Sequence, residues 1–342
     1  MPITDLSYKT NFIKSYILRK SLTWKGDGAM KFYLKKLITL IITLLFVSFI
    51  TFFAFQVIPG DSAIAKLGMD ATEEQLFELR ESMGLNDPMF VRYGRFLGNA
   101  VSGNFGTSTQ YNVSVASLIA DRFPVTAWLA ALSVLFMVVI SLPLGLLCAR
   151  KENGFLDRFI TFISQTFMAV PPFFLGIIIT LLFGIILKWF VPGRYVPISQ
   201  DVGGFLSYMI FPALAVSIPK VAMLTKFLKT SLLRELSHDY VRTAKSKGLK
   251  KKQIMIKHVL KNALIPVITF FGMLIADALA GSIVVEQVFN LPGMGRMLVT
   301  AIANRDFSVV SAAVLYIAGI VIIINFIVDM TYQKVDPRVR IS

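Results

Sequence analysis

Residues 123–149 read FPVTAWLAALSVLFMVVISLPLGLLCA and contain no charged side chain. As an α-helix this run is about 40 Å long, which exceeds the roughly 30 Å hydrocarbon core of a bilayer. A helix also satisfies its backbone hydrogen bonds internally, as a segment surrounded by lipid must. The run therefore predicts a membrane-spanning helix.

Working outward from this run, the chain contains five more apolar stretches of spanning length. The chain is 55% apolar with a mean hydropathy of +0.68, and only 16% of its residues are charged. The shortest stretch, 202–219, contains Pro212 and Pro219, and one other is interrupted by Asp277. We predict an all-α, polytopic membrane protein with six transmembrane helices at residues 37–60, 123–149, 159–187, 202–219, 262–285 and 307–328.

The net charge of +15 has an uneven distribution along the chain. Roughly three quarters of the 35 Lys and Arg residues fall in alternate connecting segments, which is the positive-inside pattern. Residues 1–36 and 331–342 are then cytoplasmic, 61–122 is extracytoplasmic, and 123–330 is a five-helix core with a cytoplasmic loop at 220–262. This pattern explains the basic composition without a nucleic-acid partner.

The extracytoplasmic loop is too long for a plain connector and contains helix signals. Thr72-Glu-Glu-Gln75 is a capping box, and Gly84 suits the end of the helix that follows. Asp87 and Pro88 are typical of an N-cap and a first helical residue, with this second helix ending near Gly103. The loop is predicted to form a small helical module, either a dock for a binding protein or a structural lid.

A basic stretch, Asp239-Tyr-Val-Arg-Thr-Ala-Lys-Ser-Lys-Gly248, lies between the fourth and fifth apolar runs. Asp239 is a plausible N-cap for a helix through Lys247, and Gly248 can adopt the left-handed conformation that ends it. A polar helix between two spans lies in water at the membrane face, where another protein can bind it.

This stretch resembles the cytoplasmic coupling (EAA) loop of ABC importer permeases. Arg242 and Thr243 replace the usual Glu and first Ala, whereas Ala244 and Gly248 are kept, as is common in peptide permeases. Other motifs follow the order of that family: residues 59–61 (PGD), 83–88 (MGLNDP), 103–108 (GNFGTS), 171–176 (PPFFLG), 286–296 (EQVFNLPGMGR), 304–306 (NRD) and 336–340 (DPRVR). The chain is similar to the B-type subunit of dipeptide, oligopeptide and nickel permeases.

The resemblance implies half of a transmembrane pathway in a bacterial or archaeal cell membrane. It implies three kinds of partner: a homologous C-type permease, two ATPase subunits that bind ATP and magnesium, and an extracytoplasmic substrate-binding protein. Di- or oligopeptides are the expected substrates, with nickel or a metal chelate as the alternative. The residues expected to form the cytoplasmic coupling helix are Asp239, Tyr240, Arg242, Thr243, Ala244 and Gly248.

No catalytic residue, cofactor or metal site is expected in this chain itself. The sequence has no Gly-x4-Gly-Lys-Ser/Thr phosphate-binding loop. His238 and His258 both fall in the cytoplasmic loop, without carboxylate or thiolate partners at metal-ligand spacing. A secondary transporter would need buried ionisable residues for ion coupling, and only Asp277 interrupts the predicted spans.

Two further positions are candidate functional residues. Asp277 falls near mid-depth of the fifth span, where a lipid-facing carboxylate costs ~2.5–3.5 kcal/mol. We expect it to line the pathway and attract a cationic group, or to make a structural hydrogen bond across the permease interface. Glu286 and Arg296 bracket a breaker-rich segment that is either an outer gate or a tight turn. Its other candidate residues are Phe289, Asn290, Pro292, Gly293 and Gly295.

Overall fold

The computed structural model describes residues 34–54, 71–82 and 84–335, and these ranges are predominantly helical. Within these ranges, Thr107 and Ser114 pair as an isolated antiparallel β-bridge. Five of the described helices are long and apolar enough to cross a membrane, and a bent pair makes a sixth if it is counted as one span. The all-α polytopic prediction is confirmed.

The first described helix is Leu34–Ala54. The helices that follow it are α3 (Glu73–Ser82), α4 (Met89–Val101), α5 (Val115–Arg150), α6 (Phe155–Ala169), α7 (Pro172–Ile179), η1 (Thr180–Ile186), α8 (Val202–Leu236), α9 (Asp239–Ser246), α10 (Lys251–Gln253), η2 (Ile254–Val259), α11 (Leu260–Val288), α12 (Met294–Ala303) and α13 (Phe307–Val335).

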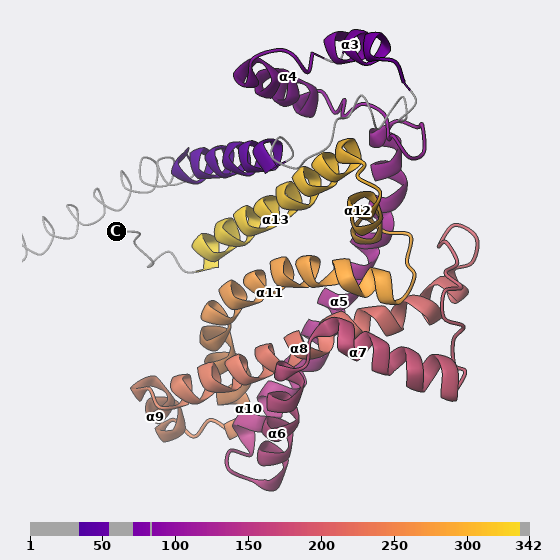
Figure 1. Ribbon diagram of the computed structural model, residues 1–342. Helices are drawn as coiled ribbons and strands as arrows, with labels where there is room; N and C mark the ends of the chain where they lie inside the picture. The colour runs from indigo at the N-terminus through magenta and orange to yellow at the C-terminus, as the bar shows by residue number, and fades with distance from the viewer. Residues whose placement is uncertain (1–33, 55–70, 83, 336–342) are drawn as a thin grey trace, which may run out of the picture.

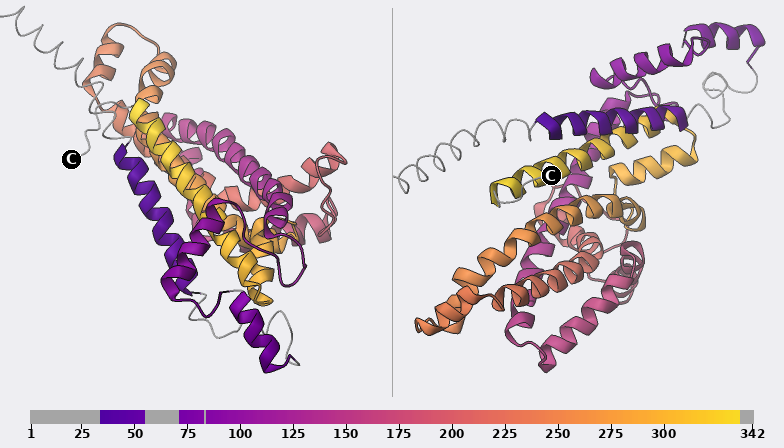
Figure 2. Two further views of the ribbon diagram at one scale, coloured as in Figure 1. Left: turned by 90° about the horizontal axis from the view of Figure 1, so that it is seen from above. Right: turned by 90° about the vertical axis from the view of Figure 1, so that its left-hand side faces the viewer.

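The most buried helix is α8, which packs against α5, α6, α7 and α11 (Figure 1). Leu129, Met137, Phe205, Met209 and Leu228 are fully buried in this core. Helix Leu34–Ala54 lies beside α13, away from α8 (Figure 2). Burial of these large apolar side chains between α5, α8 and α11 holds the central helices together.

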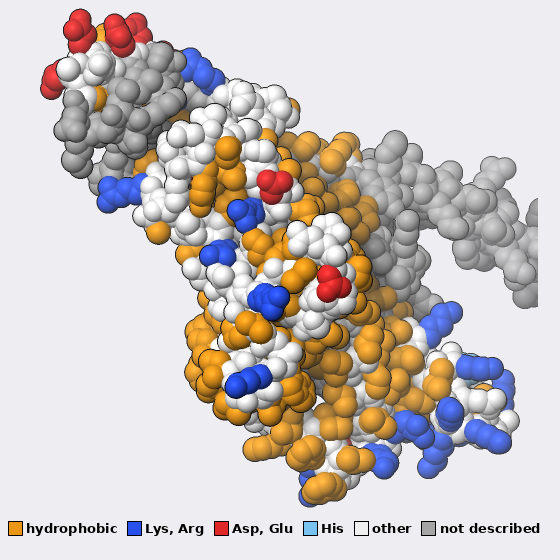
Figure 3. All heavy atoms as spheres, turned by 90° about the vertical axis from the view of Figure 1, so that its right-hand side faces the viewer, with side chains coloured by type: hydrophobic (Ala, Val, Ile, Leu, Met, Phe, Trp, Pro, Cys, Tyr) orange, Lys and Arg blue, Asp and Glu red, His pale blue; other side chains and the backbone are white. Residues whose placement is uncertain are grey.

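The two ends of the bundle differ. Helix α9 lies at the end where helix Leu34–Ala54 begins and α13 finishes, and α3, α4 and α12 lie toward the opposite end (Figure 2). Lys and Arg side chains gather over the α9 and α10 region, and acidic side chains gather over α3 (Figure 3). Hydrophobic side chains cover much of the surface between, as expected of a protein embedded in lipid.

The predicted span 202–219 was too short. Helix α8 continues past Pro212 and Pro219 to Leu236. Proline removes one helix hydrogen bond, but neighbouring helices can satisfy the freed carbonyls. Separately, the Ser133 hydroxyl on α5 donates to the Ala213 carbonyl at 3.3 Å and so joins α5 to α8. Much of the predicted loop 220–262 is therefore helix, and Lys220 lies inside a candidate span.

The predicted span 159–187 is not one straight helix. Helix α6 ends at Ala169, and the segment 172–186 continues at an angle of 104°. Pro171 and Pro172 cause this break, because a proline disfavours helical geometry in the residue before it. Val170 is accordingly extended, with φ −93° and ψ 123°.

The loop predicted to be extracytoplasmic contains the two predicted helices, α3 and α4. The capping box is present, with Thr72 N 3.1 Å from Gln75 Oε1 and Gln75 N 3.4 Å from Thr72 Oγ1. Gly84 and Gly103 have φ of 63° and 73°, as helix-ending glycines do. The expected N-cap at Asp87 was wrong, because α4 is capped by Pro88. The Asp87 carboxylate instead accepts a 2.7 Å hydrogen bond from Arg95.

The end of this module is joined to the last span. The Ser108 hydroxyl donates a 2.5 Å hydrogen bond to Asp306 Oδ2, and Gln110 N lies 3.3 Å from the same oxygen. Asp306 is 1% exposed, and its other oxygen accepts from Val309 N at the start of α13. A carboxylate at a helix N-terminus satisfies amides that have no partner within the helix.

Parts of the predicted N-terminal segment 1–36 and of the tail 331–342 lie outside the described residues, as does the 59–61 motif. Residues 34–36 belong to the first described helix, and residues 331–335 belong to α13.

Candidate functional site

Helix α9 forms a short basic projection between two long helices. It follows α8 after a two-residue turn, and the chain returns through α10 and η2 into α11. Arg242, Lys245, Lys247 and Lys250 are all exposed. The predicted polar helix between two spans is therefore present. It lies at the end of the bundle where helix Leu34–Ala54 begins and α13 finishes (Figure 1).

The ends of α9 follow the prediction with one shift. The N-cap is His238 rather than Asp239, which is the first helical residue and places its carboxylate near the helix N-terminus. Helix α9 finishes at Ser246, with Lys247 as its C-cap. Gly248 has φ +77° as predicted, and its N–H donates to the Lys245 carbonyl at 2.9 Å. Gly248 is thus the residue that turns the chain back toward the bundle.

One face of α9 packs on the chain itself. Val241 is fully buried and Ala244 is 8% exposed, so Ala244 is a packing residue. The Tyr240 hydroxyl donates to Glu235 Oε2 at 2.8 Å. Burial raises the pKa of Tyr240, so its hydroxyl remains protonated and able to donate at neutral pH. The face left free for a partner carries Asp239, Arg242 and Thr243.

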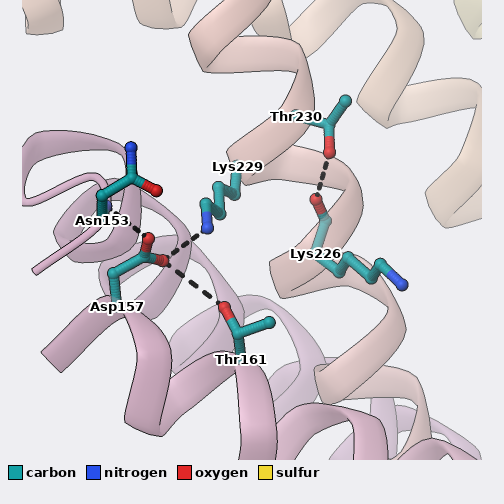
Figure 4. Close-up of polar contacts among 6 residues, drawn as sticks. All are labelled: Asn153, Asp157, Thr161, Lys226, Lys229 and Thr230. Carbon is teal, nitrogen blue, oxygen red and sulfur yellow. Dashed lines mark hydrogen bonds and ion pairs between the residues drawn. The ribbon is translucent and has the colours of Figure 1, made fainter. Parts of the chain in front are cut away.

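A buried ion pair fixes α6 against α8 (Figure 4). Asp157 Oδ1 lies 2.5 Å from Lys229 Nζ, and the Asp157 and Lys229 side chains are 4% and 20% exposed. The backbone N–H of Asn153 and the Thr161 hydroxyl also donate to Asp157, at 2.9 and 3.4 Å. With three donors, this carboxylate is held as a structural clamp between the two helices.

At the other end of the bundle, Glu286 joins three helices. It lies near the end of α11 and is fully buried. Its Oε2 accepts from the backbone N–H groups of Gly295 and Arg296, at 2.8 and 3.2 Å, in the first turn of α12. Thr126 on α5 donates to Glu286 Oε1 at 2.6 Å and accepts from Met294 N at 2.9 Å. Glu286 therefore serves as a cap for α12, supplied from another helix.

The turn at residues 289–295 (the outer turn) bends at Asn290 rather than at one of its glycines. Asn290 has φ +55° and follows the C-cap of α11, and Leu291 N donates to the Glu286 carbonyl at 2.8 Å. Gly293 is extended, and a Cβ at this position would overlap the Glu286 carboxylate. Gly295 similarly leaves space for the close backbone of Ile283. Gly293 therefore leaves room for the Glu286 side chain, and Gly295 leaves room for the backbone of α11. The bend itself is set by Asn290.

Side chains of α8 and α12 also form hydrogen bonds with the outer turn. The Tyr208 hydroxyl on α8 donates to the carbonyl of Phe289, which is 1% exposed, and accepts from Gly193 N at 3.0 Å. Arg296 Nη1 donates to the Asn290 carbonyl at 3.2 Å. Beside the turn is a cavity of about 290 Å³, whose lining includes Arg122, Trp128, Tyr195 and Pro292.

Asp277 has an unexpected partner inside the bundle. Lys220 on α8 forms an ion pair with it, and the Lys220 and Asp277 side chains are 8% and 57% exposed. The prediction that Asp277 is the only ionisable residue in the spans was wrong, because α8 is longer than expected and contains Lys220. Glu286 lies at the end of a candidate span and Asp157 in the bent pair.

Sequence reasoning missed several residues that form these sites. Lys229 and Tyr208 act through partners on other helices, and no local pattern indicates such contacts. Asn290 carried a signal, since Asn is one of the few residues other than Gly that adopts positive φ readily. Thr126 lies near the start of the second predicted span, and the sequence gave no indication of its partner.

The fold and these sites define a polytopic helical membrane protein with an exposed basic helix between two of its spans. Residues 141–341 match the family described as "Binding-protein-dependent transport system inner membrane component", and residues 29–130 match the family's N-terminal model. The chain belongs to this family of transport permease subunits. The family prediction made from the sequence is confirmed.

Two relatives are similar to this chain in sequence, and one solved structure is similar to it in fold. The chain is 34% identical over 309 residues to the "Probable peptide ABC transporter permease protein y4tP" of Sinorhizobium fredii, covering 90% of this chain and 99% of the relative. It is 35% identical over 300 residues to the oligopeptide transport system permease protein AppB of Bacillus subtilis, covering 87% and 95%. A chain of the inward-facing MetNI methionine ABC transporter has a similar fold, with a TM-score of 0.52, 17% identity, and 64% and 96% coverage.

Proposed function

We propose that this chain forms half of the translocation pathway of an ATP-driven importer of di- or oligopeptides. The observation that carries the proposal is the position of α9, an exposed basic helix projecting from a bundle of spans. Its free face offers a contact to a separate ATPase, and Gly248 fixes its angle to α11. Relatives at 34 and 35% identity are named for peptides or oligopeptides rather than for nickel, which favours peptides.

The partners in this proposal are those expected of an importer. A homologous C-type permease supplies the other half of the pathway, and two ATPase subunits bind ATP and magnesium. An extracytoplasmic binding protein delivers the substrate to the end that carries α3, α4 and the outer turn. The charge distribution supports an orientation with α9 and both termini in the cytoplasm.

The geometry supports coupling by rigid-body motion. Val241 and Ala244 pack α9 onto the chain, and η2 continues from α10 into α11 with Ile254 and Val259 buried. A displacement of α9 by ATPase closure would therefore reach α11 through packed side chains. Glu286, near the end of α11, caps α12, so the same displacement would reach the outer turn.

The test is transport by a reconstituted complex. The chain and its candidate partners are inserted into liposomes, and ATP-dependent uptake of labelled trialanine is measured beside uptake of labelled nickel. Peptide uptake without nickel uptake is expected. Nickel uptake without peptide uptake would overturn the substrate assignment.

Contact at α9 is tested separately by cross-linking, in a background where the buried Cys148 is replaced by Ala. A cysteine at Thr243, on the free face, should cross-link to the ATPase. A cysteine at Val241, on the packed face, is the matched control and should not. Equal cross-linking by the two variants would contradict the proposed docking face.

A further inference from the structure

The Lys220–Asp277 pair has an asymmetry that the Asp157–Lys229 clamp lacks. Asp157 is 4% exposed and accepts from Asn153 and Thr161 as well as from Lys229. Asp277 is 57% exposed, and within the described residues Lys220 is its recorded donor. One carboxylate is enclosed by fixed donors, whereas the other has a free side that another group can reach.

That free side belongs to a continuous exposed stripe along α11. Its members recur at intervals of three, four or seven residues, which places them on one helix face. They are Pro266, Met273, Asp277, Ala280, Val284 and Gln287. Asp277 is the one ionisable residue of the stripe and lies near its middle. A carboxylate at this depth facing lipid is costly, so this face of α11 is expected to meet protein or water.

Lys220 changes what such a site can bind. It belongs to α8 and pairs with Asp277 of α11, and its side chain is 8% exposed. Because the pair is neutral, a lone cation that takes Asp277 leaves the Lys220 ammonium buried without a partner. Removing one member of an ion pair is unfavourable when the charge that remains is buried. The site therefore disfavours a simple cation, contrary to the expectation that Asp277 alone attracts one.

A zwitterion avoids this cost. Its ammonium can replace Lys220 at Asp277 while its carboxylate pairs with Lys220, so that each of the four charges keeps a partner. We propose that Lys220 and Asp277 form an exchangeable ion pair that binds the charged ends of a zwitterionic substrate at mid-depth of the pathway. The proposal rests on the proposed function, to which it adds the pathway residues that recognise a free peptide.

The test compares variants of the reconstituted complex. K220M/D277N removes both charges, and the charge swap K220D/D277K keeps an ion pair but reverses it. D157N/K229M is the matched control, since it neutralises the other ion pair on α8. Complex assembly, ATP hydrolysis and uptake of trialanine are measured for each, with uptake expressed per assembled complex.

K220D/D277K can still pair both charged ends of a zwitterion in the reverse order and should retain more trialanine uptake than K220M/D277N. Both variants are expected to assemble and hydrolyse ATP, and K220M/D277N should show trialanine uptake reduced about tenfold or more. This is the effect expected from the loss of hydrogen bonds between charged groups. D157N/K229M should transport at the wild-type rate per assembled complex. If K220M/D277N assembles and transports like wild type, if K220D/D277K transports no better than K220M/D277N, or if neither assembles, the pair is structural and the proposal is overturned. A wild-type complex that transports no peptide would instead overturn the proposed function.

Discussion

Thr126 on α5 and Glu286 on α11, 160 residues apart, share a 2.6 Å hydrogen bond at a site where the Glu286 side chain is fully buried. The Thr126 oxygen also accepts from Met294 N at the start of α12. One hydroxyl thus connects three helices at the outer turn.

Replacing Thr126 with Val should therefore destabilise the protein. The change leaves the Met294 N–H and one Glu286 oxygen without their partner, and such losses typically cost about 1–3 kcal/mol each. The apparent unfolding temperature in detergent, at a fixed scan rate, should fall. Thr126→Ser retains the hydroxyl and is the control. An equal fall in both variants would indicate lost methyl packing instead.

Gly293→Ala should be more harmful than an ordinary Gly→Ala change in a helix. The added Cβ would overlap the Glu286 carboxylate, and overpacking of this kind costs about 1–3 kcal/mol. Gly98→Ala in α4 is the matched control, because a Cβ there meets nothing within 4 Å. It should stabilise α4 by about 0.5–1 kcal/mol. A stable Gly293→Ala protein would mean that Glu286 is free to move away.

Gly248→Val should disrupt coupling through backbone strain. No atom lies within 4 Å of a Cβ at Gly248, but its φ is +77°, which costs other residues about 1–2 kcal/mol. Peptide uptake should fall while the chain still inserts into the membrane. Gly248→Asn is the control, since Asn tolerates this conformation, and it should retain most of the uptake. Full uptake by Gly248→Val at normal abundance would refute a role for this turn.

The clamp between α6 and α8 should respond differently to single and double changes. Lys229→Met leaves Asp157 buried beside only two donors, and Asp157→Asn leaves Lys229 without its carboxylate partner. Each single change should lower the free energy of unfolding. Because Lys229 is 20% exposed, the loss should fall at the lower end of the range of about 3–5 kcal/mol for buried pairs. D157N/K229M should be more stable than either single variant. A strictly additive double-mutant cycle would show that the ion pair contributes no coupling energy.

The outer turn can be tested for gating by labelling, with Cys148 replaced by Ala. Gln287→Cys places an exposed thiol at the end of α11, whereas Met294 is fully buried. Asn290 is a poorer labelling position because of its positive φ. In the nucleotide-free complex, a thiol reagent should label Gln287→Cys but not Met294→Cys. A change at either position in the ATP-trapped complex is expected, and unchanged labelling at both would argue against a gate.

Hydropathy and helix signals predicted much of the fold, because each is encoded within a few adjacent residues. The capping box at Thr72 and the left-handed turn at Gly248 are examples. The proline effects were harder to predict. Pro171 and Pro172 break a span, whereas α8 continues past Pro219, since packing against neighbours decides whether a proline is tolerated.

The polar partners could not be predicted from local sequence. Lys220 was assigned to a loop because the apolar run stops before it, yet α8 continues for four more turns. Its pairing with Asp277 depends on how α8 and α11 pack, which hydropathy does not report. The helix N-caps at Pro88 and His238 were each displaced by one residue, within the usual uncertainty of helix ends.

The bond between Ser108 and Asp306 has a consequence for biosynthesis. The ribosome adds Asp306 198 residues after Ser108. At about 5–20 residues per second, the earlier segment waits roughly 10–40 s for its partner. During this interval four later spans must be inserted, and the loop between the first two spans cannot adopt its final structure. The last span to be made therefore completes the first loop, so a chain truncated before α13 would leave that loop unfinished and open to quality-control proteases.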